Sequence, residues 1–206
     1  MWHMLMLRST NASIAGIMLA AGQSRRMGTN KLLLLLADEL LVHRACRRAL
    51  AASLDPLIVV LGHDSERVRT ALADLDCKFA LNSNACTPMS ASLHTGLEGV
   101  PPDADAVVVM LADMIHVTEQ MVRDLTAAAS TSAAPLIVSR YGDVLAPPVL
   151  FRRALFSELL VTGGEGCGKA VIEHHRMSAH FIDWPSAALD DVDTPEEFAR
   201  LQGRGG

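Results

Sequence analysis

Short apolar runs alternate along the chain with stretches whose apolar residues recur at helical spacing. The runs predict buried strands, and the stretches predict amphipathic helices. The expected strands are 14–19, 57–61, 77–81, 106–111, 136–139 and 179–184, with an extended return over 147–151. The expected helices are 41–50, 65–73, a segment from Met89 or Ser90, 118–129 and 170–174. This alternation predicts an α/β fold with a doubly wound, mostly parallel sheet in a Rossmann-like three-layer αβα arrangement.

Polar residues between these elements predict where the first turns lie. Leu32 to Leu36 is apolar and predicts a short extended stretch, and Asp38 with Glu39 marks a turn after it. Asp64 is expected to cap the helix that begins at Ser65.

The composition suits one folded domain. Half of the 206 residues are hydrophobic, which is enough for a sizeable core, so we expect an N-terminal extension over 1–13 and a single domain over 14–206. The net charge of -5 argues against a nucleic-acid partner, because duplex binding needs a broad basic face. Arg44, Arg47 and Arg48 are expected on a solvated face of the first helix.

Cysteine usage and hydropathy indicate the compartment. Cys46, Cys77, Cys86 and Cys167 are widely spaced and form no CxxC pair or zinc pattern, so we interpret them as reduced thiols. No segment approaches the roughly twenty unbroken apolar residues that cross a bilayer, and the short apolar start is not a signal peptide. We therefore expect a cytoplasmic protein with no membrane partner.

The stretch from Leu19 to Lys31, which reads LAAGQSRRMGTNK, follows the first expected strand directly. Its small residues leave backbone amides exposed, and hydroxyl, guanidinium and ammonium donors follow them in the same loop. The small residues are Ala20, Ala21 and Gly22, and the donors are Ser24, Arg25, Arg26 and Lys31. This combination suits a polyphosphate, so the loop is predicted to bind an anion.

The loop fits neither of the commoner phosphate motifs. GxxxxGK[ST] is absent because Gly22 and Gly28 are six residues apart and two residues separate Gly28 from Lys31, and GxGxxG is absent as well. The stretch instead resembles the LAAGxSxRMGxxK signature of the nucleotidyltransferases of the molybdenum cofactor family. The matching residues are Leu19, Ala20, Ala21, Gly22, Ser24, Arg26, Met27, Gly28 and Lys31.

A second element, after the third expected strand, resembles the family's GMSxSLxxGL element. It matches at Met89, Ser90, Ser92, Leu93, Gly96 and Leu97 and has Pro88 in place of glycine. A helix that starts here offers free N–H groups and two hydroxyls at the carboxyl ends of the strands, where ligands bind in open α/β sheets. We expect Asn84, Ser90 and Ser92 to contact the nucleotide. A well-capped helix is the alternative interpretation.

The most apolar strand, 106–111, runs into Ala112 and Asp113. A carboxylate at the end of a buried strand is costly to desolvate unless it meets a cation, so Asp113 is the first candidate metal ligand. It also matches the magnesium-binding aspartate of the family's DxP motif. Residues 114–116, Met-Ile-His, stand where the proline usually appears, which leaves the acceptor contacts unassigned.

Two later segments resemble family elements. Residues 163–169, GGEGCGK, are similar to GDxGAR, and the resemblance implies an acceptor phosphate site formed by Gly164, Gly166 and Lys169. A flexible turn and a plain helix N-terminus are the alternatives. The segment at 191–196 resembles the family's DxDTPED element. The resemblance implies a second magnesium ligand, which is Asp191 or Asp193, and we prefer Asp191. The same residues are also typical of the start of a helix.

These resemblances cover Ile14 to about Leu201 and imply a nucleotide-diphospho-sugar transferase type of fold with Mg²⁺-dependent nucleotidyl transfer. The implied reaction transfers CMP from CTP to molybdenum-molybdopterin, releases pyrophosphate, and matures the molybdenum cofactor for a molybdenum hydroxylase apoenzyme. The implied phosphate ligands are the Ala21 and Gly22 amides with Ser24, Arg25 and Arg26 for the β- and γ-phosphates and Lys31 for the α-phosphate. Asp113 and Asp191 would hold the Mg²⁺ ion.

The sequence leaves open which nucleotide is used and which class of reaction is catalysed. Ala21 favours CTP, because the guanylyl relatives carry a glycine there, but a GTP-dependent guanylyltransferase stays open. A sugar- or polyol-phosphate nucleotidyltransferase shares the first motif. An NADPH-dependent oxidoreductase and a non-catalytic chaperone of the cofactor are the alternatives from other classes.

Overall fold

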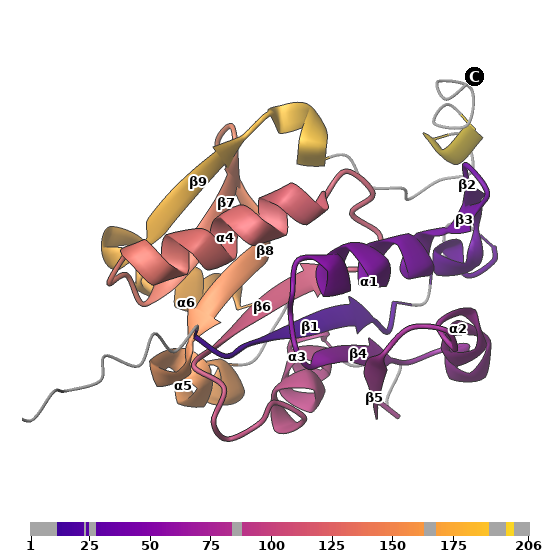
Figure 1. Cartoon of the computed structure of the whole chain (residues 1–206), viewed down its shortest axis with the longest axis horizontal. Helices are drawn as coiled ribbons and strands as arrows, with labels where there is room; N and C mark the ends of the chain where they lie inside the picture. The colour runs from indigo at the N-terminus through magenta and orange to yellow at the C-terminus, as the bar shows by residue number, and fades with distance from the viewer. Residues whose placement is uncertain are drawn as a thin grey trace, which may run out of the picture.

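The described part of the chain is built on one seven-stranded sheet (Figure 1). The computed structural model describes residues 12–22, 24, 28–83, 88–162, 168–189 and 197–199. The strands are β1 (Ile14–Ala20), β4 (Leu57–Leu61), β5 (Cys77–Leu81), β6 (Ala106–Leu111), β7 (Leu136–Tyr141), β8 (Val144–Arg152) and β9 (His180–Trp184). Their order is β5-β4-β1-β6-β8-β7-β9. Only β8 runs against the other strands of this sheet, since it pairs antiparallel with both β6 and β7.

The two faces of the sheet are covered by different helices. One buried cluster joins the sheet to α1 (Leu41–Ala51), α2 (Ser65–Ala71) and α4 (Glu119–Thr131). The other joins it to α3 (Met89–Glu98), α5 (Phe156–Val161) and α6 (Lys169–His174). The predicted mostly parallel, three-layer αβα fold is confirmed.

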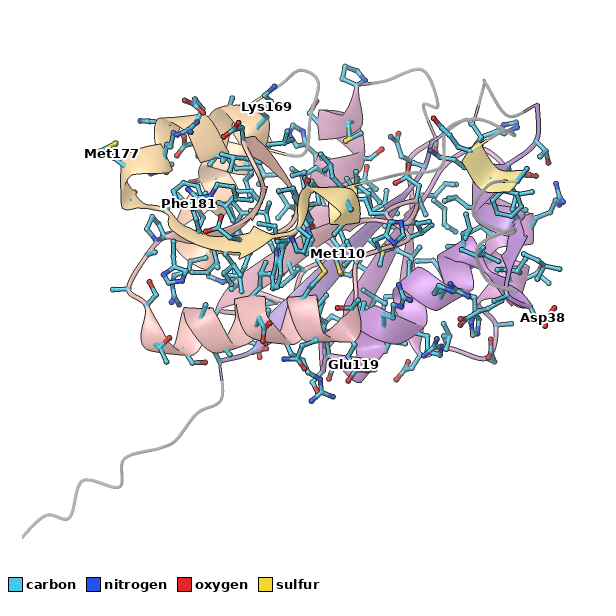
Figure 2. All side chains as sticks on the ribbon, turned by 90° about the horizontal axis from the view of Figure 1, so that it is seen from above. Asp38, Met110, Glu119, Lys169, Met177 and Phe181 are labelled. Atoms are coloured by element: carbon cyan, nitrogen blue, oxygen red, sulfur yellow. The ribbon has the colours of Figure 1, made fainter. Side chains whose placement is uncertain are left out.

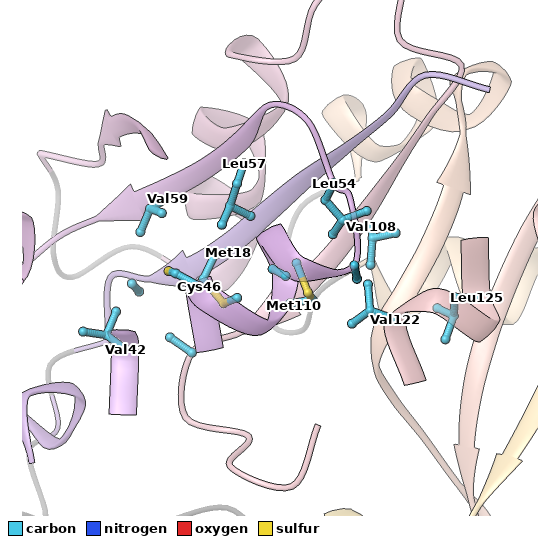
Figure 3. Packing of buried hydrophobic residues seen from close by; sticks show 14 of the residues in the cluster. Met18, Val42, Cys46, Leu54, Leu57, Val59, Val108, Met110, Val122 and Leu125 are labelled. Carbon is cyan, nitrogen blue, oxygen red and sulfur yellow. The ribbon is translucent and has the colours of Figure 1, made fainter. Parts of the chain in front are cut away.

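Alternation along the central strand explains why both faces are apolar. In β1, Met18 and Ala20 belong to the α1 side, whereas Ile17 and Leu19 belong to the α3 side. Figure 3 shows Met18 among Val42 and Cys46 of α1 and Val59 and Met110 of the neighbouring strands. A strand buried on both faces reads as an unbroken apolar run, which is the pattern from which it was predicted.

The segment between the first strand and the first helix differs from the prediction. The stretch from Leu32 to Leu36 was expected to be extended, but it begins in a 3-10 helix, η1 (Lys31–Leu33). Asn30 caps this helix, because its Oδ1 accepts from the Leu32 N–H at 3.1 Å. A hairpin of β2 (Leu35–Leu36) and β3 (Glu39–Leu40) follows. Its two turn residues, Ala37 and Asp38, have φ of 49° and 61°, the left-handed values that a tight hairpin turn needs.

Smaller differences concern helix ends. Asp64 precedes α2 as predicted, but its side chain makes no cap hydrogen bond and instead pairs with Arg67 at 3.0 Å. The pattern did not predict α5 or the short 3-10 helices η2 (Arg153–Leu155), η3 (Arg176–Ser178) and η4 (Ser186–Leu189). Within the described ranges, no helix has the length and apolar character needed to cross a membrane.

Candidate active site

The loops after β1 and β6 leave the sheet side by side at its carboxyl edge. The two strands are parallel neighbours with Leu19 opposite Leu111, and the Ala112 N–H donates to the Leu19 carbonyl at 3.2 Å. The chain reaches β4 on one side of β1 and later β6 on the other side, so this edge is the point where the strand order reverses. Ligands of open α/β sheets bind at such a switch point.

An ion pair joins the two loops at this point. Lys31 Nζ lies 2.7 Å from Asp113 Oδ2, and the two side chains are only 11% and 23% exposed. The Lys31 backbone is anchored in turn, because its N–H donates to Ser24 Oγ at 3.1 Å. The structure thus brings together Ser24, Lys31 and Asp113, which are three of the predicted site residues.

The backbone after β1 is open on one side and packed on the other. A Cβ atom added at Gly22 would meet no described atom within 4 Å, so this part of the loop faces open space. Ala21 is packed by contrast, because a Cβ added at Gly62, just after β4, would lie 2.7 Å from the Ala21 carbonyl oxygen. Because Gly62 has no side chain, Ala21 can lie directly beside it. Because Gly22 has no side chain either, the backbone amides around it are accessible to an anion.

The two serines at the start of α3 are both buried, and at least one has a structural task. Ser92 Oγ accepts from Asn82 Nδ2 at 3.0 Å, which ties the helix to the end of β5. Further along α3, a Cβ at Gly96 would lie 2.6 Å from Ile17 Cγ2, so this glycine lets the helix approach the sheet closely. These contacts give the helix a packing role, but they do not support the alternative of a well-capped helix, because Pro88 at the N-cap position makes no side-chain cap hydrogen bond. Nucleotide contacts of Ser90 and Ser92 stay a prediction.

Arg48 is a site residue that the sequence analysis misplaced. It was expected on a solvated helix face, but its Nη1 donates to the carbonyl oxygens of Ile115 and Val117, both at 2.8 Å. Burial lowers the pKa of Arg48, and the neighbouring guanidinium groups of Arg44 and Arg47 add to this effect. Arg48 therefore fastens the segment that follows Asp113 onto α1. The helical pattern of the sequence predicts that position 48 lies on the polar face of α1. It cannot predict that carbonyl groups from a distant loop will cover this face.

Most of the other predicted site residues cannot be placed relative to this ion pair. Arg25, Arg26, Asn84, Gly164, Gly166, Asp191 and Asp193 lie outside the described residues. Lys169 is exposed at the start of α6, where the preceding Gly168 packs against Phe151. Phe151 pairs with Val107, near the opposite end of β6 from Asp113. In Figure 2, Lys169 lies in the other half of the molecule from Asp38, which belongs to the β2–β3 turn.

Asp113 has the chemistry of a ligand for a hard cation. Its oxygens are the donors that Mg²⁺ and Mn²⁺ prefer, and the side chain is partly exposed at the open edge of the sheet. The ammonium group 2.7 Å from it shows that this carboxylate already binds positive charge. Asp113 is therefore the described residue of this site that has the chemistry to bind a divalent ion.

Comparison with known families decides the broad identity. The model of the MobA-like NTP transferase domain matches residues 16–179, a range that contains Lys31, Asp113 and the strands that carry them. The chain belongs to the MobA-like NTP transferase family. This MobA-like protein is therefore a nucleotidyltransferase by family, and enzymes of this kind use a divalent metal ion.

Two curated relatives match almost the whole MobA-like chain. The purine catabolism protein PucB of Bacillus subtilis (strain 168) is 28% identical over 195 residues, which cover 90% of this chain and 94% of PucB. A probable molybdenum cofactor guanylyltransferase of Natronomonas pharaonis is 28% identical over 200 residues, which cover 92% and 96% of the two chains. The predicted resemblance to the molybdenum cofactor family is confirmed.

A solved structure also resembles this MobA-like protein over almost its whole length. Rv0371c of Mycobacterium tuberculosis superposes with a TM-score of 0.83 at 30% identity, over 93% of this chain and 99% of that one. The same mycobacterial protein has also been solved as a complex with manganese, with a TM-score of 0.79 and 28% identity, again over 93% and 99% of the two chains.

Proposed function

We propose that this protein transfers CMP from CTP to molybdenum-molybdopterin and releases pyrophosphate in a Mg²⁺-dependent reaction. The observation that carries the proposal is the Lys31–Asp113 pair at the carboxyl edge of β1 and β6. A cation and a carboxylate lie here beside the loop after β1, and nucleotidyl transfer needs a cation, a metal ligand and phosphate-binding amides in one place.

Each described residue has a distinct task in this reaction. The backbone after β1, with Ser24, would bind the β- and γ-phosphates through amide and hydroxyl donors. Lys31 would neutralise the charge on the α-phosphate while an acceptor phosphate oxygen attacks the phosphorus in line. Asp113 would hold Mg²⁺, which supplies charge stabilisation for the departing pyrophosphate. Arg25 and Arg26 of the same loop, and Asp191 near the C-terminus, are proposed as additional ligands.

The preference for CTP rests on Ala21. In the structure its methyl group lies beside Gly62 at the end of β4, where a side chain at position 62 would collide with it. A methyl group that stays in place narrows the space for a base and disfavours a purine, by about 1–3 kcal/mol at most. A molybdenum hydroxylase apoenzyme is the proposed recipient of the finished cofactor, and Gly164 and Gly166 are proposed to bind the acceptor. Lys169 is left out of this proposal, because it lies toward the opposite end of β6 from Asp113.

One relative's name supports a competing nucleotide. The Natronomonas pharaonis relative is named a molybdenum cofactor guanylyltransferase and matches this chain as extensively as PucB does. GTP is therefore the second candidate, and the same experiment must separate the two.

Thermal unfolding with CTP, GTP and NADPH, each with and without Mg²⁺, tests the proposal. A ligand at a hundred times its Kd adds about 2.7 kcal/mol to the free energy of unfolding, which raises Tm by about 5–10 °C. We expect a Mg²⁺-dependent rise with CTP. A rise with GTP alone would transfer the proposal to guanylyl transfer, and a rise with NADPH alone would replace it with an oxidoreductase.

A further inference from the structure

A second cluster of ligand groups lies at the other end of the sheet. Glu158 belongs to α5, His174 is the last residue of α6, and His175 follows it directly. The chain enters α5 from the end of β8, where Arg152 pairs with Ala106 at the amino end of β6. Asp113 follows the carboxyl end of the same strand, so the cluster and the candidate active site are separate places on the molecule.

The three side chains converge through their ligand atoms. His174 Nδ1 lies 2.8 Å from Glu158 Oε1, and His175 Nε2 lies 2.7 Å from Glu158 Oε2. The three groups each place a ligand atom within 4.8 Å of the others. The two imidazole rings stack with centroids 4.7 Å apart, so they lie side by side next to the same carboxylate. One carboxylate is thus shared by two imidazoles.

A second histidine with two acidic neighbours shows why this geometry matters. His43 contacts Glu39 through Nδ1 at 2.9 Å and Asp74 through Nε2 at 3.1 Å. Its two nitrogens point in different directions, so the carboxylates sit on opposite sides of the ring and cannot share an ion with it. In the Glu158 cluster, by contrast, one ligand atom from each of the three residues lies within 4.8 Å of the other two, which is close enough for a single ion to contact all three.

The donor set selects a class of ion. Two imidazole nitrogens and one carboxylate oxygen suit Zn²⁺ and similar divalent transition ions rather than Mg²⁺, which prefers oxygen ligands. Donors around a tetrahedral zinc ion lie about 3.3 Å apart, so a modest outward movement of these side chains would admit the ion.

We propose that Glu158, His174 and His175 form a binding site for one divalent transition-metal ion, with Zn²⁺ as the preferred ligand. The ion replaces the direct carboxylate–imidazole contacts and leaves a fourth coordination position for water. It fastens the end of α6 to α5, on the sheet face opposite α1 and α4. The site does not depend on the nucleotidyl transfer proposed above, and metal binding can be measured without any substrate.

Zinc titration of the full-length protein against a chromophoric chelator tests this site. The Asp113→Asn variant serves as the background, so that the candidate active site does not contribute a ligand. We expect one zinc equivalent whose affinity falls at least about tenfold in Glu158→Gln and in His175→Gln, because even the outer partner of a metal ligand is worth that much. Co²⁺ bound in place of zinc should show nitrogen and oxygen coordination and no thiolate charge-transfer band.

Matched variants separate the cluster from general surface binding. Glu173→Gln lies on the same helix, and His180→Gln removes an exposed histidine elsewhere, so both should keep the parental zinc affinity. His174→Gln changes the most exposed member and provides a third variant if a more buried one folds poorly. Equal zinc affinity in the cluster variants and their controls, a cobalt spectrum with thiolate ligands, or no bound zinc at all would each overturn the proposal.

Discussion

Lys31 and Asp113 are charged groups that folding has largely removed from water. Their side chains are 11% and 23% exposed, and each compensates the other across 2.7 Å. Such a pair contributes little net stability, because desolvation offsets most of the attraction, but removal of one partner is costly. The pair is therefore better explained by chemistry than by stability, since it keeps a cation and a carboxylate together at the edge where we propose that the nucleotide binds.

Truncation of Lys31 tests the catalytic role at the scale of one residue. We expect Lys31→Ala to lower kcat by at least about a hundredfold, because a preorganised charge that stabilises a transition state is typically worth that much. Lys78→Ala removes an exposed lysine from β5 and should leave kcat unchanged. Circular dichroism should show both variants folded, and a folded Lys31→Ala enzyme with parental turnover would remove the catalytic role of this loop.

Ala21 should determine part of the nucleotide preference. In Ala21→Gly the methyl group packed beside Gly62 is lost, so the space for a base grows and GTP should become a better substrate. The ratio of kcat/KM for CTP to that for GTP should fall by about 10- to 200-fold, the range that one such group supplies. An unchanged ratio in steady-state kinetics would mean that the base lies elsewhere.

At the scale of elements, Arg48 connects α1 to the segment after Asp113. In Arg48→Met, the carbonyl oxygens of Ile115 and Val117 lose a charged donor, so the free energy of unfolding should fall by about 1.5–3 kcal/mol. Mg²⁺-dependent nucleotide binding should weaken as well, because Asp113 is then held less firmly. Urea unfolding and calorimetry measure the two effects.

Arg47→Met is the matched control for this change. Arg47 lies one position earlier on the same helix but is half exposed and pairs with Glu39 at 2.8 Å. Arg47→Met also removes an ion pair, so its stability should fall as well, but it should keep the parental nucleotide affinity because Arg47 donates no hydrogen bond to the segment after Asp113 in the described part of the chain. An equal loss of nucleotide affinity in both variants would contradict a specific role for Arg48.

The β2–β3 hairpin is joined to α1 through Glu39, and this contact should make stability depend on pH. Arg47, followed by His43 and Arg44, holds the pKa of Glu39 at about 2 against an ordinary value of 4.5, although burial opposes the shift. The folded pKa is the lower one, so the stabilisation is complete above 4.5 and is lost as the pH falls toward 2. The stability difference between the parent and Glu39→Gln should therefore shrink from about pH 6 to about pH 3 in urea unfolding. A constant difference would contradict this assignment.

For the molecule as a whole, the local hydrophobic pattern predicted where the helices and strands lie better than it predicted which strands pair with one another. The apolar runs of β1, β4 and β6 were recognisable because both faces of these strands are buried. The insertion of β8 between β6 and β7 could not be predicted, since pairing between distant segments leaves no local signal. The sequence motif singled out Lys31 and Asp113, but their direct contact depends on the register of two strands far apart in the chain.

The measurement that tests the central claim most directly is pyrophosphate release from CTP with molybdenum-molybdopterin as acceptor. We expect pyrophosphate and a nucleotide-linked cofactor to form together, only when Mg²⁺ is present, and not in Asp113→Asn, whose neutral amide is a poorer ligand for the ion. Asp105→Asn, at the opposite end of the same strand, should keep the activity. Cofactor binding without pyrophosphate release from CTP, GTP or ATP would contradict nucleotidyl transfer and leave a non-catalytic carrier of the cofactor.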